Sequence, residues 1–132
     1  MPVMMPSTGA LRAFAERYTA AWCSQNPDAV AAFFAPNGSL RVNDSPPAIG
    51  RDAIATTAQS FMTTFPDLRV LFDDLRIDGD RIEYHWTLTG THLNGRKVRI
   101  SGYEDWRFDS DDLIANSQGS FDAAEYQRQL EA

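Results

Sequence analysis

The stretch that decides the fold is RIEYHWTLTGTHLNGRKVRISGYEDWRF, which spans residues 81–108. On both sides of Asn94-Gly95, apolar and polar side chains alternate with the period of two that is typical of a half-buried strand. Asn-Gly is also a strong signal for a tight hairpin turn. The stretch therefore predicts two antiparallel strands, residues 81–91 and 98–108, each with one apolar and one polar face.

Two registers fit this hairpin. A two-residue loop pairs Glu104 with His85 and sets apolar faces against polar ones. A three-residue loop over residues 93–95, with Gly95 left-handed, places Glu104 opposite Tyr84 and brings the apolar faces together. We expect the second register, because a slip of one residue turns every side chain to the other face of the sheet.

In this register Glu104 carries a carboxylate on an otherwise apolar face, beside Trp106 and diagonal to Trp86. Such a carboxylate is either neutral with a raised pKa or hydrogen-bonded inside a cavity. A rim position with access to water, or a salt bridge to an arginine, would also satisfy it. Acids in such surroundings gather at functional sites, so Glu104 is the leading candidate for function.

Composition excludes several classes of partner. The 132 residues carry a net charge of −6, and the only lysine is Lys97. No basic patch stands out in the sequence, so neither nucleic acid nor an anionic membrane is expected as a partner. We expect one domain over residues 1–132, with residues 1–7 disordered and no signal peptide. The single cysteine, Cys23, excludes an internal disulfide and favours the reducing cytoplasm.

The rest of the chain predicts an α+β fold. Apolar spacing and capping signals predict helices at residues 8–24, 27–34, 51–65 and 122–131. Further strands are expected at residues 39–42, 68–78 and 113–120, with a β-bulge at Asp73-Asp74. Three helices followed by four consecutive antiparallel strands favour helices packed on one face of a curved, mostly antiparallel sheet. We expect a pocket between the two layers.

Short motifs along the chain point to a known family. They are Tyr18-Thr19-Ala20-Ala21-Trp22, Phe33-Phe34-Ala35, Gly50-Arg51-Asp52-Ala53-Ile54 and Phe65-Pro66-Asp67-Leu68-Arg69. In this order and spacing the chain resembles the NTF2-like superfamily, and within it the SnoaL-like polyketide cyclase group. The resemblance implies a cystatin-like cone with a pocket. It does not specify an activity, because the superfamily includes isomerases, cyclases and non-catalytic binders.

The resemblance is incomplete where cyclase chemistry would be expected. SnoaL-like cyclases carry a His and an Asp on the last strand. Here the matching stretch is residues 115–118, or residues 116–119 if it is shifted by one, and neither alignment contains an ionisable group. Asn116 and Gln118 can form hydrogen bonds but cannot carry a proton at neutral pH. They are expected to bind a ligand rather than to catalyse a cyclisation.

Individual positions match ketosteroid isomerases, which share this fold, more closely. Those enzymes combine a tyrosine of the first helix and a protonated strand acid as an oxyanion hole, with an aspartate as base. The resemblance implies Tyr18, Glu104 and Asp44 in these three roles. A neutral buried acid beside a phenol can hydrogen-bond a carbonyl oxygen as it gains negative charge. The alternatives remain open that Tyr18 is a core residue and that Asp44 only stabilises a turn.

Three functions therefore remain open. The chain is an acid/base isomerase of a small apolar carbonyl compound, a non-catalytic pocket for an apolar or aromatic molecule, or a dimerising structural protein. The helix-free face, with Thr87, Ser101 and Tyr103, suits a homodimer. No metal or other cofactor is expected, because His85 and His92 have no neighbouring ligands. The residues expected to line the ligand pocket are Tyr18, Trp22, Phe61, Phe65, Tyr84, Trp86, Glu104, Trp106, Asn116 and Gln118.

Overall fold

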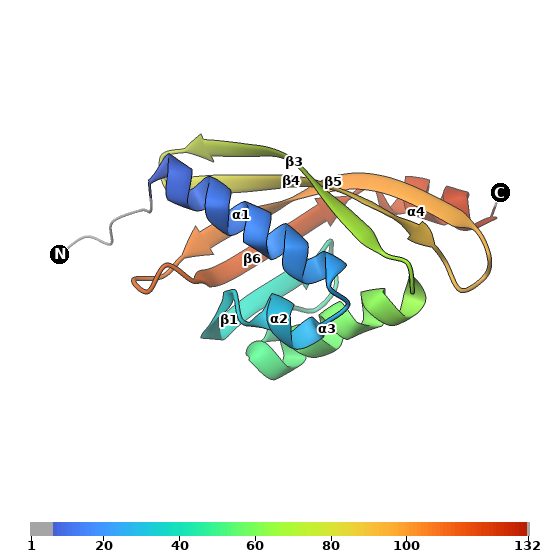
Figure 1. Cartoon of the computed structure of the whole chain (residues 1–132), viewed down its shortest axis with the longest axis horizontal. Helices are drawn as coiled ribbons and strands as arrows, with labels where there is room; N and C mark the ends of the chain where they lie inside the picture. The colour runs from blue at the N-terminus through green and yellow to red at the C-terminus, as the bar shows by residue number, and fades with distance from the viewer. Residues whose placement is uncertain (1–6, 132) are drawn as a thin grey trace.

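The computed structural model describes residues 7–131 (Figure 1). Its elements are α1 (Thr8–Cys23), α2 (Pro27–Ala31), β1 (Phe34–Val42), β2 (Ala48–Ile49), α3 (Arg51–Thr64), β3 (Arg69–Asp78), β4 (Arg81–Thr91), β5 (Lys97–Phe108), β6 (Ile114–Phe121) and α4 (Ala123–Glu131). Ser7 is the N-cap of α1, where its Oγ accepts a hydrogen bond from the backbone N–H of Ala10. The other residues expected to be disordered, 1–6, lie outside the described part of the chain.

The strands form one sheet in the order β2-β1-β6-β5-β4-β3. Every pairing is antiparallel except that of β1 with β6, which is parallel. Figure 1 shows α1 lying across the curved sheet, with α2 and α3 beside β1. The α+β fold and the mostly antiparallel sheet predicted from the sequence are therefore confirmed.

The central hairpin has the expected register. Tyr84 pairs with Glu104 across β4 and β5, and the ladder continues without interruption from Ile82↔Trp106 to Thr91↔Lys97. Gly95 adopts φ +88° in the three-residue loop, a left-handed conformation that favours glycine. The bulge expected in β3 is also present, because its register with β4 shifts between Phe72 and Asp74.

The second helix is shorter than predicted. It ends at Ala31, whereas Phe34, expected to be its last residue, begins β1. Pro36-Asn37-Gly38 lies inside β1, where the register with β6 shifts. A Cβ on Gly38 would lie 2.8 Å from the carbonyl oxygen of Ile114. The absence of a side chain at Gly38 therefore allows the two strands to approach closely. Pairing with β6 overrides the helix that the local sequence predicts.

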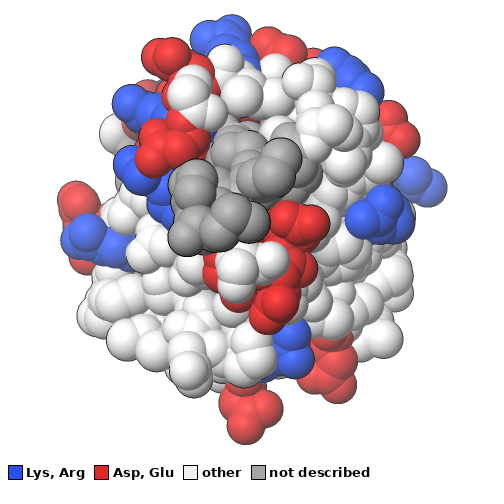
Figure 2. Space-filling view, turned by 90° about the vertical axis from the view of Figure 1, so that its left-hand side faces the viewer, with Lys and Arg blue, Asp and Glu red and all other residues white. Residues whose placement is uncertain are grey.

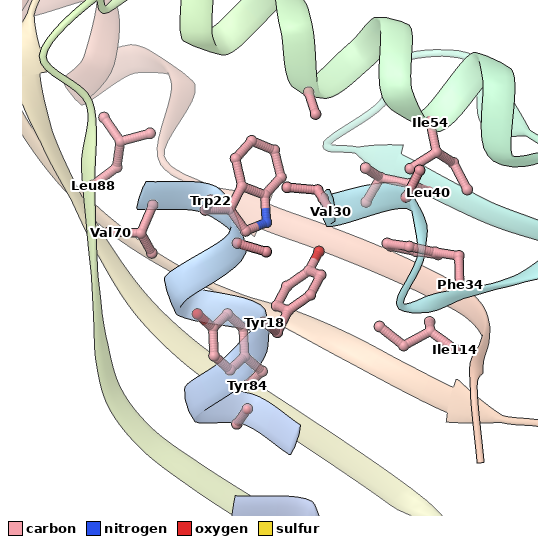
Figure 3. Packing of buried hydrophobic residues seen from close by; sticks show 14 of the residues in the cluster. Tyr18, Trp22, Val30, Phe34, Leu40, Ile54, Val70, Tyr84, Leu88 and Ile114 are labelled. Carbon is pink, nitrogen blue, oxygen red and sulfur yellow. The ribbon is translucent and has the colours of Figure 1, made fainter. Parts of the chain in front are cut away.

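The core lies between the helices and the concave face of the sheet (Figure 3). Tyr84 of β4 stacks on Trp106 of β5 with ring centroids 4.8 Å apart, and Tyr18 of α1 meets Trp106 edge-on at 5.3 Å. Such aromatic pairs each stabilise a fold by about 0.5–1.5 kcal/mol beyond the burial of their surface. The apolar stripe expected on the first helix is buried and comprises Leu11, Phe14, Ala15, Tyr18, Ala21 and Trp22.

Helix α4 covers an edge of the sheet that β6 leaves unpaired. The β5–β6 ladder begins at Gly102, so residues 97–101 of β5 have no strand on that side. The side-chain amide of Gln129 fills this gap: its Nε2 donates to the carbonyl oxygen of Arg99 at 2.9 Å, and its Oε1 accepts from the Arg99 N–H at 2.8 Å. The backbone of this edge is thereby satisfied by a side chain instead of a strand.

Candidate functional site

A cavity of about 70 Å³ lies between the helices and the concave face of the sheet. Its wall is almost entirely apolar, and Glu104 is the only carboxyl group among the lining residues. Cavities of this kind are the usual place for a small-molecule ligand. The lining residues are Trp22, Leu40, Val42, Phe61, Phe65, Val70, Tyr84, Trp86, Leu88, Ile100, Glu104, Gly119, Phe121 and Tyr126.

Three hydrogen-bond donors converge on one oxygen of Glu104. The Oε1 atom accepts from the Tyr18 hydroxyl at 2.9 Å, from Trp106 Nε1 at 3.0 Å and from Ser117 Oγ at 2.8 Å. The Oε2 atom receives only a longer contact of 3.3 Å, again from the Tyr18 hydroxyl. The two oxygens of the carboxyl group are therefore unequal, and Oε2 is the one left for a further partner.

Burial raises the pKa of Glu104 above its ordinary value, and the three donors oppose this shift. Desolvation is the larger cause, since the residue is only 7% exposed. The pKa of Tyr18 is raised well above its ordinary value, first by burial and then by the nearby carboxyl group. Tyr18 therefore remains a phenol that donates its proton to the hydrogen bond with Glu104.

The sheet register explains why these groups meet. Glu104 faces Gly119 on β6, and Trp106 faces Ser117 on the same strand. Because alternate residues of a strand share one face, Glu104 and Trp106 both point toward α1, where Tyr18 is fully buried. Gly119 carries no side chain that would stand beside the carboxyl group in the cavity.

Most of the residues expected in the pocket lie there. Six of them are in the cavity wall: Trp22, Phe61, Phe65, Tyr84, Trp86 and Glu104. Tyr18 and Trp106 were also expected in the wall, but they lie behind Glu104 and reach the site through their hydrogen bonds to it. They hold the acid and do not line the cavity.

On the last strand, the two residues predicted to bind the ligand do not face the cavity. Asn116 is exposed and donates to Ser39 Oγ, while Gln118 donates to the carbonyl oxygen of Asn43. Neither lines the cavity. The residue between them, Ser117, is 1% exposed and bonds Glu104. Counting back by twos from the apolar Phe121 would have identified Ser117.

Asp44 is not brought to Glu104. It lies in an exposed turn after β1 and is absent from the cavity wall. The strand ends two residues earlier at Val42, whose side chain does line the cavity. Asn43 between them adopts φ 51°, which interrupts the alternation that would otherwise have placed Asp44 on the inner face.

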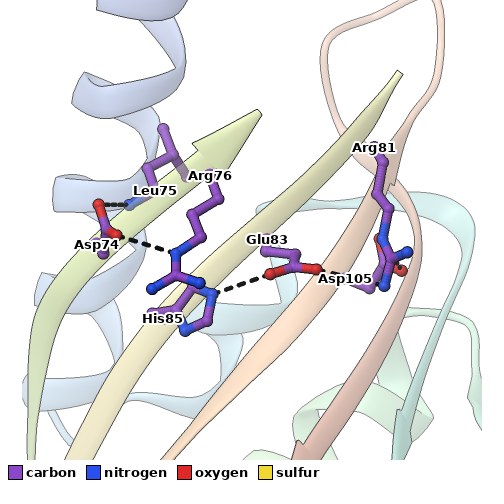
Figure 4. Close-up of polar contacts among 7 residues, drawn as sticks. All are labelled: Asp74, Leu75, Arg76, Arg81, Glu83, His85 and Asp105. Atoms are coloured by element: carbon purple, nitrogen blue, oxygen red, sulfur yellow. Dashed lines mark hydrogen bonds and ion pairs between the residues drawn. The ribbon is translucent and has the colours of Figure 1, made fainter. Parts of the chain in front are cut away.

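The opposite face of the sheet carries a separate set of charged contacts (Figure 4). His85 Nε2 lies 3.0 Å from Glu83 Oε1, and Arg81 contacts both Glu83 and Asp105. The ring of His85 stacks on Tyr103 at 5.4 Å. As expected, His85 does not share the face of Glu104. Within residues 7–131, no group of three His, Cys, Asp or Glu side chains is arranged to hold a metal ion.

Fold and site together define a small α+β protein with an aromatic cavity and one buried acid. The chain belongs to the SnoaL-like polyketide cyclase family, whose model matches residues 12–130. It has no match among curated protein sequences. Among the helices of residues 7–131, none is both long and apolar enough to cross a membrane.

Solved structures share the fold at low sequence identity. A protein of ketosteroid isomerase-like fold from Catenulispora acidiphila, in complex with trimethylamine, is 17% identical over 89% of this chain and 92% of that one, with a TM-score of 0.80. An NTF2-like protein from Burkholderia pseudomallei is 22% identical over 92% and 97%, with a TM-score of 0.79. TerC co-crystallized with polyporic acid is 14% identical over 92% and 98%, also with a TM-score of 0.79.

Proposed function

We propose that the protein binds a small apolar or aromatic molecule in the cavity and holds its polar group through Glu104. The observation that carries this proposal is the single carboxyl group in an otherwise apolar wall. A ligand that enters the cavity meets rings and aliphatic side chains everywhere else. One polar contact then fixes its orientation, as is usual for sites of this kind.

The proposed form of Glu104 is the neutral acid. Its proton belongs on Oε2, because Oε1 already accepts three hydrogen bonds. A proton at Oε2 is available for donation to a carbonyl oxygen of the ligand. Tyr18 supports this arrangement from behind, since its hydroxyl holds Oε1 at 2.9 Å.

The reaction that such a site would support is proton transfer next to a carbonyl group. When a base removes a proton from the carbon beside the carbonyl, negative charge develops on the carbonyl oxygen and the Glu104 hydrogen bond strengthens. Returning the proton to another carbon completes an isomerisation. Asp44 is the proposed base, which requires the exposed residues 44–47 to fold over the cavity. Ligand binding itself does not depend on Asp44.

A second candidate ligand is a small alkylammonium ion. The three donors on Oε1 also stabilise an ionised carboxylate, and several aromatic rings face the same cavity. Rings and a carboxylate together form the surroundings in which a quaternary or protonated amine is stable. The charge of Glu104 distinguishes the two candidates: a neutral acid favours a carbonyl compound and a carboxylate favours an amine.

The experiment titrates cyclopentanone and trimethylammonium, two probes of similar size, into the protein and into Glu104→Gln. Tryptophan fluorescence and calorimetry report binding, and the infrared band of the Glu104 carboxyl group reports its charge. We expect cyclopentanone to bind and Glu104→Gln to retain it, because the amide still donates. If trimethylammonium alone binds and Glu104→Gln abolishes it, the amine is the ligand. If neither binds, the proposal fails.

Catalysis has its own measurement. Conversion of cyclopent-3-enone to cyclopent-2-enone moves one proton between carbons and is followed by the ultraviolet absorption of the conjugated product. Glu104→Gln should slow turnover while binding persists, and Asp44→Asn should slow turnover without affecting binding. Glu16→Gln, an exposed glutamate on α1, is the matched control and should change neither. If the protein binds cyclopent-3-enone without converting it, its function is that of a non-catalytic carrier or sensor.

Assembly and location complete the proposal. On the helix-free face Ser101 is exposed and Tyr103 is half-buried, a mildly polar and aromatic surface that suits a homodimer, whereas Thr87 is buried beside Ser101. We also place the protein in the cytoplasm, since its single cysteine makes no internal disulfide. Light scattering at micromolar concentration tests the dimer, and the mass of a single chain would contradict it.

A further inference from the structure

A second hollow, of about 950 Å³, lies where the hairpin between β4 and β5 meets α4. Its lining includes five cationic side chains and a single acidic one, Asp67. The five are Arg69, Arg96, Lys97, Arg99 and Arg128, and we call this surface the basic groove. They are drawn from only 12 basic residues in a chain whose net charge is −6. Almost half of the positive charge of an acidic protein therefore gathers in one place.

This concentration is local to one end of the molecule. In Figure 1 the hairpin and α4 lie at the end opposite the start of α1. Figure 2 shows that other end, where blue basic side chains lie around the rim together with red acidic and white uncharged ones. The contrast indicates that the concentration of cationic side chains in the groove is not typical of the general surface.

Most of the cations in the groove form no ion pair with an acidic residue of the described part of the chain. Within residues 7–131, Arg69, Arg96, Lys97 and Arg99 make no ion pair, whereas Arg128 is bonded to Glu125 at 2.6 Å. The one acid in the wall is also occupied. Asp67 accepts from the backbone N–H of Thr91 at 2.6 Å and from its hydroxyl at 2.8 Å.

The strand register holds two of these cations close together. Arg69 pairs with Thr89, and Thr89 pairs with Arg99, so the three residues form a row on one face of three adjacent strands. At about 4.8 Å per strand, the two arginines lie roughly 10 Å apart, with a threonine between them. Like charges at this separation repel each other, and a bound anion would remove that repulsion.

The basic groove is distinct from the cavity at Glu104. Leu88 and Ile100 line the cavity, and their chain neighbours Thr89 and Arg99 line the groove. Because successive residues of a strand point to opposite faces, the two hollows lie back to back across β4 and β5. A ligand of one does not occupy the other.

We propose that the basic groove binds a small, multiply charged anion through phosphate or carboxylate groups. Guanidinium groups match both anions with paired hydrogen bonds, and four arginines surround the hollow. Two anionic groups on one molecule span the row from Arg69 to Arg99 better than a single one. This proposal does not rest on the function proposed for the cavity.

The test measures binding of pyrophosphate, citrate and orthophosphate by calorimetry at two fixed ionic strengths. The groove variant is Arg69→Gln with Arg99→Gln. The control variant is Arg17→Gln with Arg107→Gln, two exposed arginines that lie outside the groove and lower the net charge equally. Glu104→Gln reports any contribution of the cavity. Hexaglutamate and a short single-stranded oligonucleotide serve as larger anionic probes.

We expect pyrophosphate or citrate to bind more tightly than orthophosphate, and more weakly as salt increases. The groove variant should bind about tenfold less tightly, while the control variant and Glu104→Gln change by less than about twofold. Loss of binding in the control variant would reveal a net-charge effect and overturn the proposal, as would loss in Glu104→Gln. Absence of binding, or tighter binding of hexaglutamate or the oligonucleotide than of either small anion, would also overturn it.

Discussion

Trp106 Nε1 donates a hydrogen bond of 3.0 Å to Oε1 of Glu104, the residue two positions before it on the same strand face. The indole therefore both covers the acid with an apolar ring and satisfies one of its oxygens. These two actions have opposite effects on the pKa of Glu104, because burial raises it and the hydrogen bond lowers it. The charge of this one side chain is consequently the property that most directly tests the site.

The first prediction concerns the pH dependence of Glu104→Gln. Burial raises the folded pKa of Glu104, so the folded state binds more protons than the unfolded state above the unfolded pKa of about 4.3. The parent therefore loses stability as pH rises toward the folded pKa, by up to about 1.4 kcal/mol per pH unit. Glutamine does not titrate. The stability of Glu104→Gln relative to the parent should thus be greater at pH 8 than at pH 4.

Denaturant unfolding at the two pH values measures this difference. Glu16→Gln provides the control for removal of a carboxyl group, because Glu16 is exposed. If Glu104→Gln is instead relatively less stable at pH 8, Glu104 is ionised in the folded protein. In that case the neutral-acid proposal is wrong and the alkylammonium candidate gains support.

The second prediction concerns Ser117, which was not among the site residues predicted from the sequence. Ser117→Ala removes the 2.8 Å hydrogen bond to Glu104 Oε1 from a fully buried position. We expect a loss of about 1 kcal/mol in the free energy of unfolding. The pKa of Glu104 should rise further, because that bond lowers it. Carbon-13 NMR of the labelled glutamate measures the pKa. Ser120→Ala on the same strand is the control, and an equal effect there would contradict a specific role for Ser117.

The third prediction concerns Tyr18→Phe, which removes the hydroxyl but keeps the ring. Its ring packs edge-on against Trp106, so the core should remain intact. Loss of the 2.9 Å bond to Glu104 should cost about 1 kcal/mol of stability and raise the pKa of the acid. Tyr103→Phe, on the opposite face of the sheet, should leave that pKa unchanged. An unchanged pKa in Tyr18→Phe would show that the tyrosine is only a core residue.

The fourth prediction concerns the edge of β5. Gln129→Ala removes both hydrogen bonds to the backbone of Arg99, and no strand replaces them. The Arg99 amide should then exchange with solvent markedly faster, while amides inside the β4–β5 ladder keep their protection. Gln127→Ala, which removes a hydrogen bond to the side chain of Glu131, is the control. Equal protection of the Arg99 amide in both variants would mean that Gln129 is dispensable for this edge.

The sequence predicts the hairpin well because two strong signals coincide there. The alternation on β4 and β5 and the Asn-Gly turn favour one register, and that register places Glu104 opposite Tyr84. The aromatic residues of the cavity wall are predicted by the same alternation and by the spacing of apolar residues on the helices. These features depend on residues close in sequence, where patterns are most informative.

Other features depend on contacts that no local pattern contains. Asn116 and Gln118 were selected over Ser117 by alignment with the His and Asp of SnoaL-like cyclases, and the register shift of β5 with β6 between Arg107 and Phe108 makes the phase of the short last strand hard to read from its pattern. The turn conformation at Asn43 moves Asp44 off the inner face. The basic groove could not be predicted from the sequence for a related reason. Its five cations come from β3, from the β4–β5 loop, from β5 and from α4. They form a patch only after folding.

The parallel pairing of β1 with β6 has a consequence for the order of assembly. Ser39 and Asn116, which meet in that ladder, are separated by 77 positions along the chain. Neighbouring hairpins close short loops and form quickly, whereas this pairing closes a long one. During synthesis, β3, β4 and β5 can therefore pair before β1 has its partner. We expect the β1 amides to gain protection after those of β4 in pulse-labelled refolding. Until the last strand emerges, the nascent chain has an unfinished wall and an acid that lacks one of its donors.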